Sequence, residues 1–254
     1  MAGDGETREM GTIAVTGANR GIGAAIAATL ADRGYTVACL SRGGAAPSTD
    51  EGGAKVVGRR IGLRCDITDC ASIAAALAAA DALPGGLRGV VNNAGIMMSG
   101  ASREFPVENL ETVLRTNVVG TFSVCQAAYP RLVARGGGLI VNIGSFWDEM
   151  GVKRFAAYCA SKAAIAALSR CLGVEWAKKG IRVLTVAPGY IETDMTSDAL
   201  ETEETRRYLE TRLPLGRVGR PDEIARVVAA LFLEDVGFLT ATTIYVDGGQ
   251  GPAM

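Results

Sequence analysis

The sequence predicts an α/β fold, a Rossmann-type doubly wound parallel sheet of about seven strands with helices on both faces. Short apolar runs rich in Val, Ile and Ala alternate along the chain with longer segments of helical periodicity. Strands this apolar are typical of a parallel sheet covered on both sides. A glycine-rich turn also stands between the first predicted strand and the first predicted helix, where dinucleotide-binding folds place a phosphate. We assign residues 11–254 to one NAD(P)-binding catalytic domain and residues 1–10 to a flexible tail.

Each predicted element follows from a local pattern. The first strand is a β-branched run that ends in glycine, and the first helix carries Ile22, Ile26 and Leu30 on one stripe and stops at Gly34. The same alternation continues to the last strand. The predicted strands are 11–17, 35–41, 61–67, 87–95, 137–145, 181–189 and 242–249, and the predicted helices are 22–34, 71–83, about 106–135, 156–180 and about 221–233.

Two segments lack this regularity. Residues 42–60 are rich in Gly, Ser and Pro and are predicted to form a loop. Residues 190–213 are polar and charged, and we expect one or two short helices on a mobile segment. No repeat or linker indicates a second domain.

Composition excludes several kinds of chemistry. The chain has no histidine, which rules out a Ser-His-Asp triad, histidine metal ligands and an imidazole base, and we predict no metal site. Its net charge of −1 gives no reason to expect nucleic acid or a membrane surface as partner. The six cysteines include no C-x-x-C pair and indicate a reducing compartment. No apolar run approaches the ~18–20 residues of a membrane span, so we expect a soluble, cytoplasmic protein.

The glycine-rich turn is TGANRGIG, residues Thr16 to Gly23. Glycines there allow the backbone to approach a phosphate closely, and the helix N-terminus supplies N–H donors and positive potential. The second strand ends at Ser41 and Arg42, where an NAD-binding fold often has an acidic residue. Two guanidinium groups, Arg20 and Arg42, suit a 2′-phosphate instead, so we predict NADP(H) in preference to NADH.

Three further motifs follow predicted strands or open a helix. NNAG, Asn92 to Gly95, can line a ligand crevice or merely form an Asx turn. Ser145 comes directly after another strand. YCASK, Tyr158 to Lys162, puts a phenol and an ammonium four residues apart in a helix, which alone is compatible with an ordinary surface pair. Between them, Cys159, Ala160 and Ser161 need only be small.

Taken together, these motifs resemble the short-chain dehydrogenase/reductase family. The glycine turn, Asp66, NNAG, Asn117, Ser145, YCASK, PGYIET (188–193) and YVDGG (245–249) occur in the family's order between Gly11 and Gly249. Ser145 precedes Tyr158 by 13 residues, the family's usual spacing. The segment PGYIETDMT further resembles the β-ketoacyl-acyl-carrier-protein reductase branch.

The resemblance implies a catalytic tetrad of Asn117, Ser145, Tyr158 and Lys162. Tyr158 would be the general acid in carbonyl reduction and the base in alcohol oxidation, and Ser145 would bind the substrate carbonyl. Lys162, one helical turn on, is expected to lower the phenol's pKa and to bind the nicotinamide ribose. Asn117 would hold a water that links Lys162 to solvent.

The resemblance also assigns a cofactor site. Asp66 would accept from the adenine amino group, Asn92 and the NAG backbone would lie along the adenosine ribose, and residues 188–193 would border the nicotinamide amide. The full predicted set is Gly17, Asn19, Arg20, Gly21, Ile22, Gly23, Ser41, Arg42, Asp66, Ile67, Asn93, Ala94, Gly95, Tyr158, Lys162, Pro188, Gly189, Ile191 and Thr193.

We therefore predict an NADP(H)-dependent carbonyl reductase, or alcohol dehydrogenase acting in reverse, on a small molecule. The predicted substrate pocket is Ser145, Trp147, Tyr158 and Tyr190. Phe146 and Trp147 stand where acyl-carrier-protein reductases more often have smaller residues; they form either an aromatic wall or part of the core. A homotetramer is expected, built through the helices at 106–135 and 156–178.

Two other functions stay open. A β-ketoacyl-acyl-carrier-protein reductase is the first; Val174 replaces the basic residue that such reductases often carry, which weakens docking of an acidic carrier, although Arg131 and Arg135 remain candidates. A non-catalytic NADP-binding sensor is the second, but such proteins usually lose the tyrosine or the lysine. A sugar-nucleotide epimerase would need a longer C-terminal domain than 254 residues leave room for.

Overall fold

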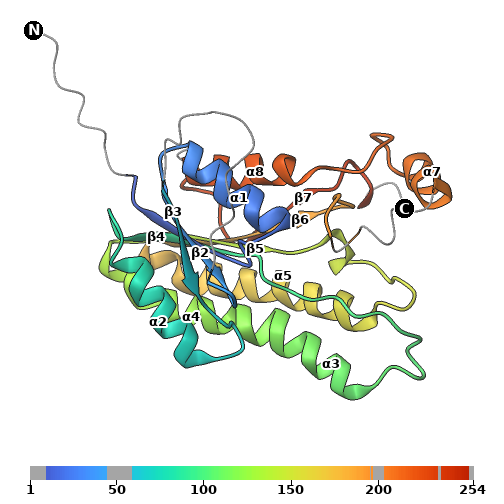
Figure 1. Ribbon diagram of the computed structural model, residues 1–254, viewed down its shortest axis with the longest axis horizontal. Coiled ribbons are helices and arrows are strands. Elements are labelled where there is room, and N and C mark those ends of the chain that lie inside the picture. The colour runs from blue at the N-terminus through green and yellow to red at the C-terminus, as the bar shows by residue number, and fades with distance from the viewer. Residues whose placement is uncertain (1–9, 45–58, 195, 197–202, 234–235, 252–254) are drawn as a thin grey trace, which may run out of the picture.

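Seven parallel strands form one sheet in the order β3-β2-β1-β4-β5-β6-β7, as the computed structural model shows (Figure 1). It describes residues 10–44, 59–194, 196, 203–233 and 236–251. The strands are β1 Thr12–Thr16, β2 Thr36–Ser41, β3 Arg59–Arg64, β4 Leu87–Asn92, β5 Gly138–Ile143, β6 Ile181–Pro188 and β7 Thr242–Val246. The predicted fold class is confirmed.

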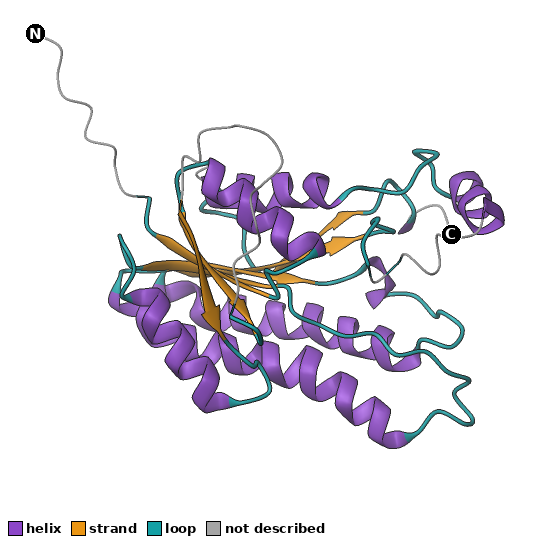
Figure 2. Ribbon diagram, in the orientation of Figure 1, coloured by secondary structure: helices purple, strands orange, loops and turns teal. Residues whose placement is uncertain are grey.

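Helices cover both faces of the sheet (Figure 2). α1 and α8 pack on one face around Ile13, Leu30 and Val228, and α2, α4 and α5 pack on the other around Leu77 and Ile140. The helices are α1 Gly21–Asp32, α2 Cys70–Asp81, α3 Val107–Leu114, α4 Thr121–Ala134, α5 Ala156–Trp176, α7 Glu203–Arg212 and α8 Pro221–Leu233, with shorter turns η1 Arg115–Gly120, η2 Phe146–Asp148 and η3 Ala177–Lys179. The strands are apolar because both of their faces are buried.

The strand order reverses at β1, which lies between β2 and β4. In a doubly wound sheet, the connections leave opposite faces at such a point and open a crevice at the carboxyl ends of the strands. The glycine turn follows β1, Arg42 follows β2, Asp66 follows β3 and Ser145 follows β5. Residues far apart in the chain therefore meet along one edge of the sheet.

The predicted helical region at 106–135 is a continuous run of α3, η1 and α4. Its middle part, η1, is a π-helix that contains the buried Asn117. A π-helical turn widens the helix and releases backbone groups from the regular α-helical pairing, and such turns are frequent at functional sites. The sequence pattern predicted the helices but gave no sign of this turn.

Other boundaries agree or shift slightly. α8 has the predicted bounds, and α7 lies within the polar segment 190–213. β3 begins at Arg59, inside the predicted loop 42–60, and ends at Arg64 rather than at residue 67. The remainder of that loop, 45–58, and residues 1–9 of the predicted tail lie outside the described residues.

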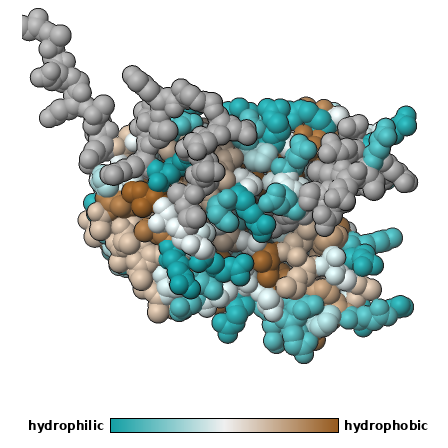
Figure 3. All heavy atoms as spheres, viewed as in Figure 1, coloured by the Kyte–Doolittle hydropathy of each residue, from teal (hydrophilic) through white to brown (hydrophobic). Residues whose placement is uncertain are grey.

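No helix in the described part of the chain is both long and apolar enough to cross a bilayer. On the face drawn in Figure 3, hydrophilic and hydrophobic residues are interspersed.

Candidate active site

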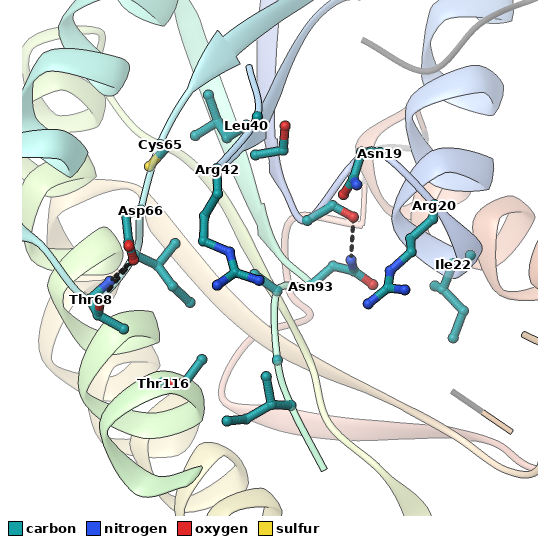
Figure 4. Close-up of a pocket in the computed structure, with 18 of the residues that line it drawn as sticks. Asn19, Arg20, Ile22, Leu40, Arg42, Cys65, Asp66, Thr68, Asn93 and Thr116 are labelled. Atoms are coloured by element: carbon teal, nitrogen blue, oxygen red, sulfur yellow. Dashed lines mark hydrogen bonds between the residues drawn. The ribbon is translucent and has the colours of Figure 1, made fainter. Parts of the chain in front are cut away.

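A cleft of about 630 Å³ lies at the carboxyl ends of β1 to β4. Most of the residues predicted to bind a cofactor line it (Figure 4). They are Gly17, Asn19, Arg20, Gly21, Ile22, Ser41, Arg42, Asp66, Ile67, Asn93, Ala94, Gly95 and Thr193. These residues come from the ends of four strands and from the segment after β6, so the topology brings the scattered motifs into one site.

The glycine turn has the geometry of an anion site. Gly21 has a φ of +53°, which side chains rarely adopt, and it opens α1 at the cleft. A Cβ on Gly23 would collide with the carbonyl oxygen of Gly17, so Gly23 serves close packing and does not line the cleft. The first turn of α1 has no acidic residue and no side-chain cap, whereas Asp69 caps α2 by accepting from the Ala71 N–H. The α1 N-terminus thus presents N–H donors that fit a phosphate.

The two asparagines of NNAG have different positions. Asn93 Nδ2 donates to the carbonyls of Thr16 and Gly17, both at 3.1 Å, and its backbone N–H donates to Thr16 Oγ1 at 3.0 Å. Asn93 therefore braces the glycine turn. The prediction that Asn92 lies along the adenosine ribose is wrong, because it is buried on the core side, where Nδ2 donates to Asn142 Oδ1 at 2.9 Å.

Asp66 stands at the end of the cleft near β2 and β3. Its Oδ1 accepts from the backbone N–H of Thr68 at 2.9 Å and from the Thr68 hydroxyl at 2.7 Å (Figure 4). These bonds, assisted by the nearby Arg42, hold the carboxyl's pKa below its ordinary value. Asp66 is therefore an ionised acceptor in an Asx turn that also lines the cleft.

The two predicted phosphate-binding arginines occupy different sides of the cleft. Arg42 extends from the end of β2 into the space between Asp66 and Asn93 (Figure 4). Arg20 lies on the opposite side, and its Nη1 is 3.7 Å from Asp194 Oδ2 in a solvent-exposed ion pair. Such exposed pairs contribute ~0–1 kcal/mol, so a phosphate could readily draw Arg20 away.

The segment after β6 only partly reaches the cleft. Thr193 lines it and Ile191 is buried in a β-bridge with Gly219. Pro188 ends β6, and Gly189 lies against Asp247 with no room for a Cβ. The predicted contacts of Pro188, Gly189 and Ile191 with nicotinamide therefore stay predictions.

Ser145, Tyr158 and Lys162 converge at the carboxyl end of β5. Ser145 follows the strand and is buried, and Tyr158 is partly exposed on the first turn of α5. Lys162 is 7% exposed; its Nζ donates to the carbonyl of Ile143 at 2.8 Å and lies 5.5 Å from the centre of the Tyr158 ring. The arrangement places a hydroxyl, a phenol and an amine together, as predicted.

The pKa of Tyr158 lies above its ordinary value, whereas the sequence led us to expect it below. Burial raises the pKa of Tyr158 to about 12, although a hydrogen bond with Ser145 opposes the shift. Burial also lowers the pKa of Lys162 from its ordinary 10.5 to about 8, so its positive charge is only partial near that pH. Desolvation thus shifts each group toward its neutral form. Tyr158 consequently stays protonated near neutral pH, which suits a proton donor.

The Asn117 side chain is hydrogen-bonded to two segments, the loop after β4 and α5. Its Oδ1 accepts from the Ile96 N–H at 2.8 Å, and its Nδ2 donates to the Ile96 carbonyl at 2.9 Å and to Ser161 Oγ at 3.0 Å. Both N–H groups of the side chain are thus donated within the protein. The predicted role of Asn117 in holding a water stays a prediction.

Ser161 makes contacts at the candidate site that the sequence interpretation missed. It was expected only to be small, but its hydroxyl accepts from Asn117 and donates to the Tyr158 carbonyl at 2.7 Å. It is completely buried. The turn of α5 that carries the phenol is therefore linked by Ser161 to Asn117 of η1. Through Asn117 it is also linked to the loop after β4. A serine inside the YCASK motif, where alanine would satisfy a requirement for small size, was the available signal.

Aromatic rings surround the phenol. Trp147 has its ring centre 5.8 Å from that of Tyr158 and 5.9 Å from that of Tyr190, both at nearly right angles. Phe146 and Trp147 are buried and contact each other, which agrees with core packing, and Trp147 also contacts the Tyr158 ring. Their alternative role as a wall of the substrate pocket stays a prediction. The predicted pocket residues Ser145, Trp147, Tyr158 and Tyr190 are neighbours in space.

Several residues that line the cleft were not predicted. They are Leu40, Gly43, Cys65, Thr68, Ile96, Thr112, Thr116 and Asp194. Most directly neighbour a predicted residue in sequence. Thr112 lies on α3 and Thr116 on η1. They line the cleft because of how this helical run packs in the folded chain, which no local motif indicates.

Comparison with known proteins places this site in a family. A family profile described as enoyl-(acyl carrier protein) reductase matches residues 17–250. The chain is 36% identical over 240 residues to the 3-oxoacyl-[acyl-carrier-protein] reductase MabA of Mycobacterium tuberculosis, covering 94% of this chain and 92% of the relative. It is also 36% identical over 236 residues to carbonyl reductase family member 4 of Xenopus laevis, covering 93% and 96%.

The fold also has solved counterparts. A crystal structure of a gluconate 5-dehydrogenase from Burkholderia cenocepacia, in complex with NADP and tartrate, superposes with a TM-score of 0.86 at 29% identity. The match covers 96% of each chain.

The buried amine gives a pH signature that can be measured. Because the pKa of Lys162 is lowered in the folded protein to about 8 from 10.5, the unfolded chain binds more protons between these values, and Lys162 makes folding more favourable as pH rises through this window. A shift of this size corresponds to roughly 3 kcal/mol. We expect the unfolding free energy of wild type, minus that of Lys162→Met, to increase between pH 8 and pH 10 in urea titrations.

Subtracting the variant removes the contributions of the other titrating groups. A difference that stays flat over this range would show that Lys162 is charged in the folded protein, contrary to the burial argument.

Proposed function

Because this chain belongs to the short-chain dehydrogenase/reductase family, we propose that it reduces a ketone to a secondary alcohol with NADPH, using Tyr158 as general acid. The observation that carries the proposal is the convergence of Ser145, Tyr158 and Lys162 at the carboxyl end of β5, on the same edge of the sheet as the cleft, which they do not line. The alcohol can be oxidised by the same groups in reverse.

The cleft residues fit a nicotinamide dinucleotide. The uncapped N-terminus of α1 and the glycine turn would hold the pyrophosphate. Asp66 would bind the adenine, and Lys162 would bind the nicotinamide ribose. When bound, the nicotinamide supplies the hydride that reduces the carbonyl carbon.

The chain's own groups handle the carbonyl oxygen. Ser145 Oγ would donate a hydrogen bond to this oxygen as negative charge develops on it. The Tyr158 hydroxyl, protonated near neutral pH because of its raised pKa, would transfer its proton to the same oxygen. The proton would then be replaced from solvent through Lys162, with Asn117 in its predicted role of holding a connecting water.

Charge at the adenosine end supports NADP(H) over NADH. Arg42 enters the cleft, Arg20 is within reach of it, and β2 ends in Ser41 without a carboxylate (Figure 4). A guanidinium matches the geometry of a 2′-phosphate, whereas the ribose hydroxyls of NAD favour an acidic partner. The gluconate 5-dehydrogenase neighbour was crystallised with NADP, which agrees with this choice.

A β-ketoacyl-acyl-carrier-protein reductase is the second candidate. The 36% identity to MabA favours it. The surface expected to dock the carrier argues against it: Val174 is 74% exposed where a cation was expected, and Arg135 is paired with Asp81 at 2.9 Å. Arg131 donates to the Ala127 carbonyl at 2.6 Å, which further limits the guanidinium groups available to an acidic partner.

We also propose that the enzyme is a cytoplasmic homotetramer. Val107, Val119 and Val174 are exposed on the helical run 107–134 and on α5, the helices expected to form its interface. Six free cysteines agree with a reducing compartment. Light scattering that gives the mass of a single chain would contradict the tetramer.

The proposal is tested with a panel of ketones and NADPH, followed at the nicotinamide absorbance band. We expect reduction with NADPH to exceed that with NADH. Arg42→Ala should raise the Kd of NADPH by roughly tenfold or more while changing that of NADH little, because a charge-assisted hydrogen bond contributes ~1.5–3 kcal/mol.

Arg33→Ala is the matched control, since Arg33 lies at the far end of α1 and is exposed; it should leave both constants unchanged. If Arg42→Ala raises both dissociation constants alike, the assignment of the 2′-phosphate site is wrong. If no ketone is reduced with either cofactor, the proposed reaction is wrong.

A further inference from the structure

We infer that the substrate is a ketone with a flat apolar substituent, such as an aryl group, and that Trp147 selects it. This rests on the proposed reduction at Tyr158. A carbonyl that reaches the Tyr158 and Ser145 hydroxyls brings its substituents against the groups beside the phenol. Those groups are aromatic: Trp147 packs edge-on against Tyr158 with ring centres 5.8 Å apart, and its ring also contacts Phe155 at 5.0 Å and Tyr190 at 5.9 Å.

The apolar packing continues away from the phenol. Phe146 contacts the Tyr190 ring with centres 5.5 Å apart. On its other side, Tyr190 packs with Val218 against Leu209 of α7 and Leu213. Rings and aliphatic side chains thus run from the proton donor to the helix after β6. A planar apolar group can lie along them and gain both burial and edge-to-face contacts.

The rings beside the phenol offer few hydrogen-bond partners to a polar substituent. Trp147 is in ring contact with Phe146, Phe155, Tyr158 and Tyr190, and the amine of Lys162, 5.5 Å from the centre of the Tyr158 ring, already donates to the Ile143 carbonyl. Asp148, the carboxylate nearest to Trp147 in sequence, accepts a hydrogen bond from the Tyr245 hydroxyl of β7 at 3.1 Å. A sugar acid or polyol buried here would lose its hydrogen bonds to water without gaining enough hydrogen-bond partners in the protein, which costs free energy.

Trp147 can be changed without disturbing the catalytic serine directly. Its link to Ser145 is a backbone one, from the Trp147 N–H to Ser145 Oγ at 3.3 Å. Replacing the side chain keeps that bond and removes only the ring. The chain also offers a matched control, because its other tryptophan, Trp176, is equally buried (7% against 8% exposed) and packs against Tyr129 elsewhere in the core.

The test measures kcat/KM with NADPH for acetophenone, 2-octanone, 2-butanone, 5-ketogluconate and an acetoacetyl thioester. We expect wild type to prefer acetophenone over 2-octanone, which has the same number of carbons, and over 5-ketogluconate and the thioester. Trp147→Leu should lower kcat/KM for acetophenone by about tenfold or more while changing that for 2-butanone less than about threefold. Trp176→Leu should keep the wild-type ratio of acetophenone to 2-octanone.

Each outcome separates this inference from the proposal on which it rests. Reduction of other ketones with no aryl preference, or an unchanged ratio in Trp147→Leu, overturns the substrate class but keeps the reductase. A thioester or 5-ketogluconate that is reduced best also overturns it. Should Trp147→Leu fail to fold by circular dichroism, Trp147→Phe replaces it, with a smaller fall in the same ratio expected and an unchanged ratio contradicting the inference. No reduction of any carbonyl by wild type overturns the reductase itself.

Discussion

The side chain of Asn117 holds the candidate active site together, because one amide joins the loop after β4 to the helix that carries the phenol. It pairs with both backbone groups of Ile96, and it donates to Ser161, whose hydroxyl continues to the Tyr158 carbonyl. The π-helical turn η1 places Asn117 between the two. Every bond in this set is 3.0 Å or shorter. The loop that borders the cleft is therefore held at a fixed position relative to Tyr158. Transfer of a hydride and a proton to one carbonyl requires such a fixed geometry.

Burial determines the protonation states of the candidate catalytic groups, Tyr158 and Lys162. In water, a cation beside a phenol lowers the phenol's pKa, but here both groups are desolvated and each shifts toward its neutral form. Lys162 compensates part of its burial by donating to the Ile143 carbonyl. A phenol that stays protonated near neutral pH is suited to donate a proton to a carbonyl oxygen.

The sequence predicted the fold class and most of the cleft because those depend on local patterns. Strand, glycine turn and helix follow one another within residues 12–32, and the topology then brings together the residues that follow each strand. The sequence interpretation failed for features that depend on tertiary packing. Asn92 and Asn93 are adjacent, yet one faces the core and the other the glycine turn. Ser161 looked like a spacer, and the shift of Tyr158 depends on burial that no motif displays. The roles assigned to individual site residues stay predictions.

The most direct test of the account is the turnover of Tyr158→Phe, measured together with its NADPH affinity. The phenylalanine keeps the ring that Trp147 contacts and removes only the hydroxyl. The account predicts that kcat for ketone reduction falls by about 10²- to 10⁴-fold while the Kd of NADPH stays close to that of wild type. A kcat near the wild-type value would show that another group supplies the proton and would contradict the mechanism.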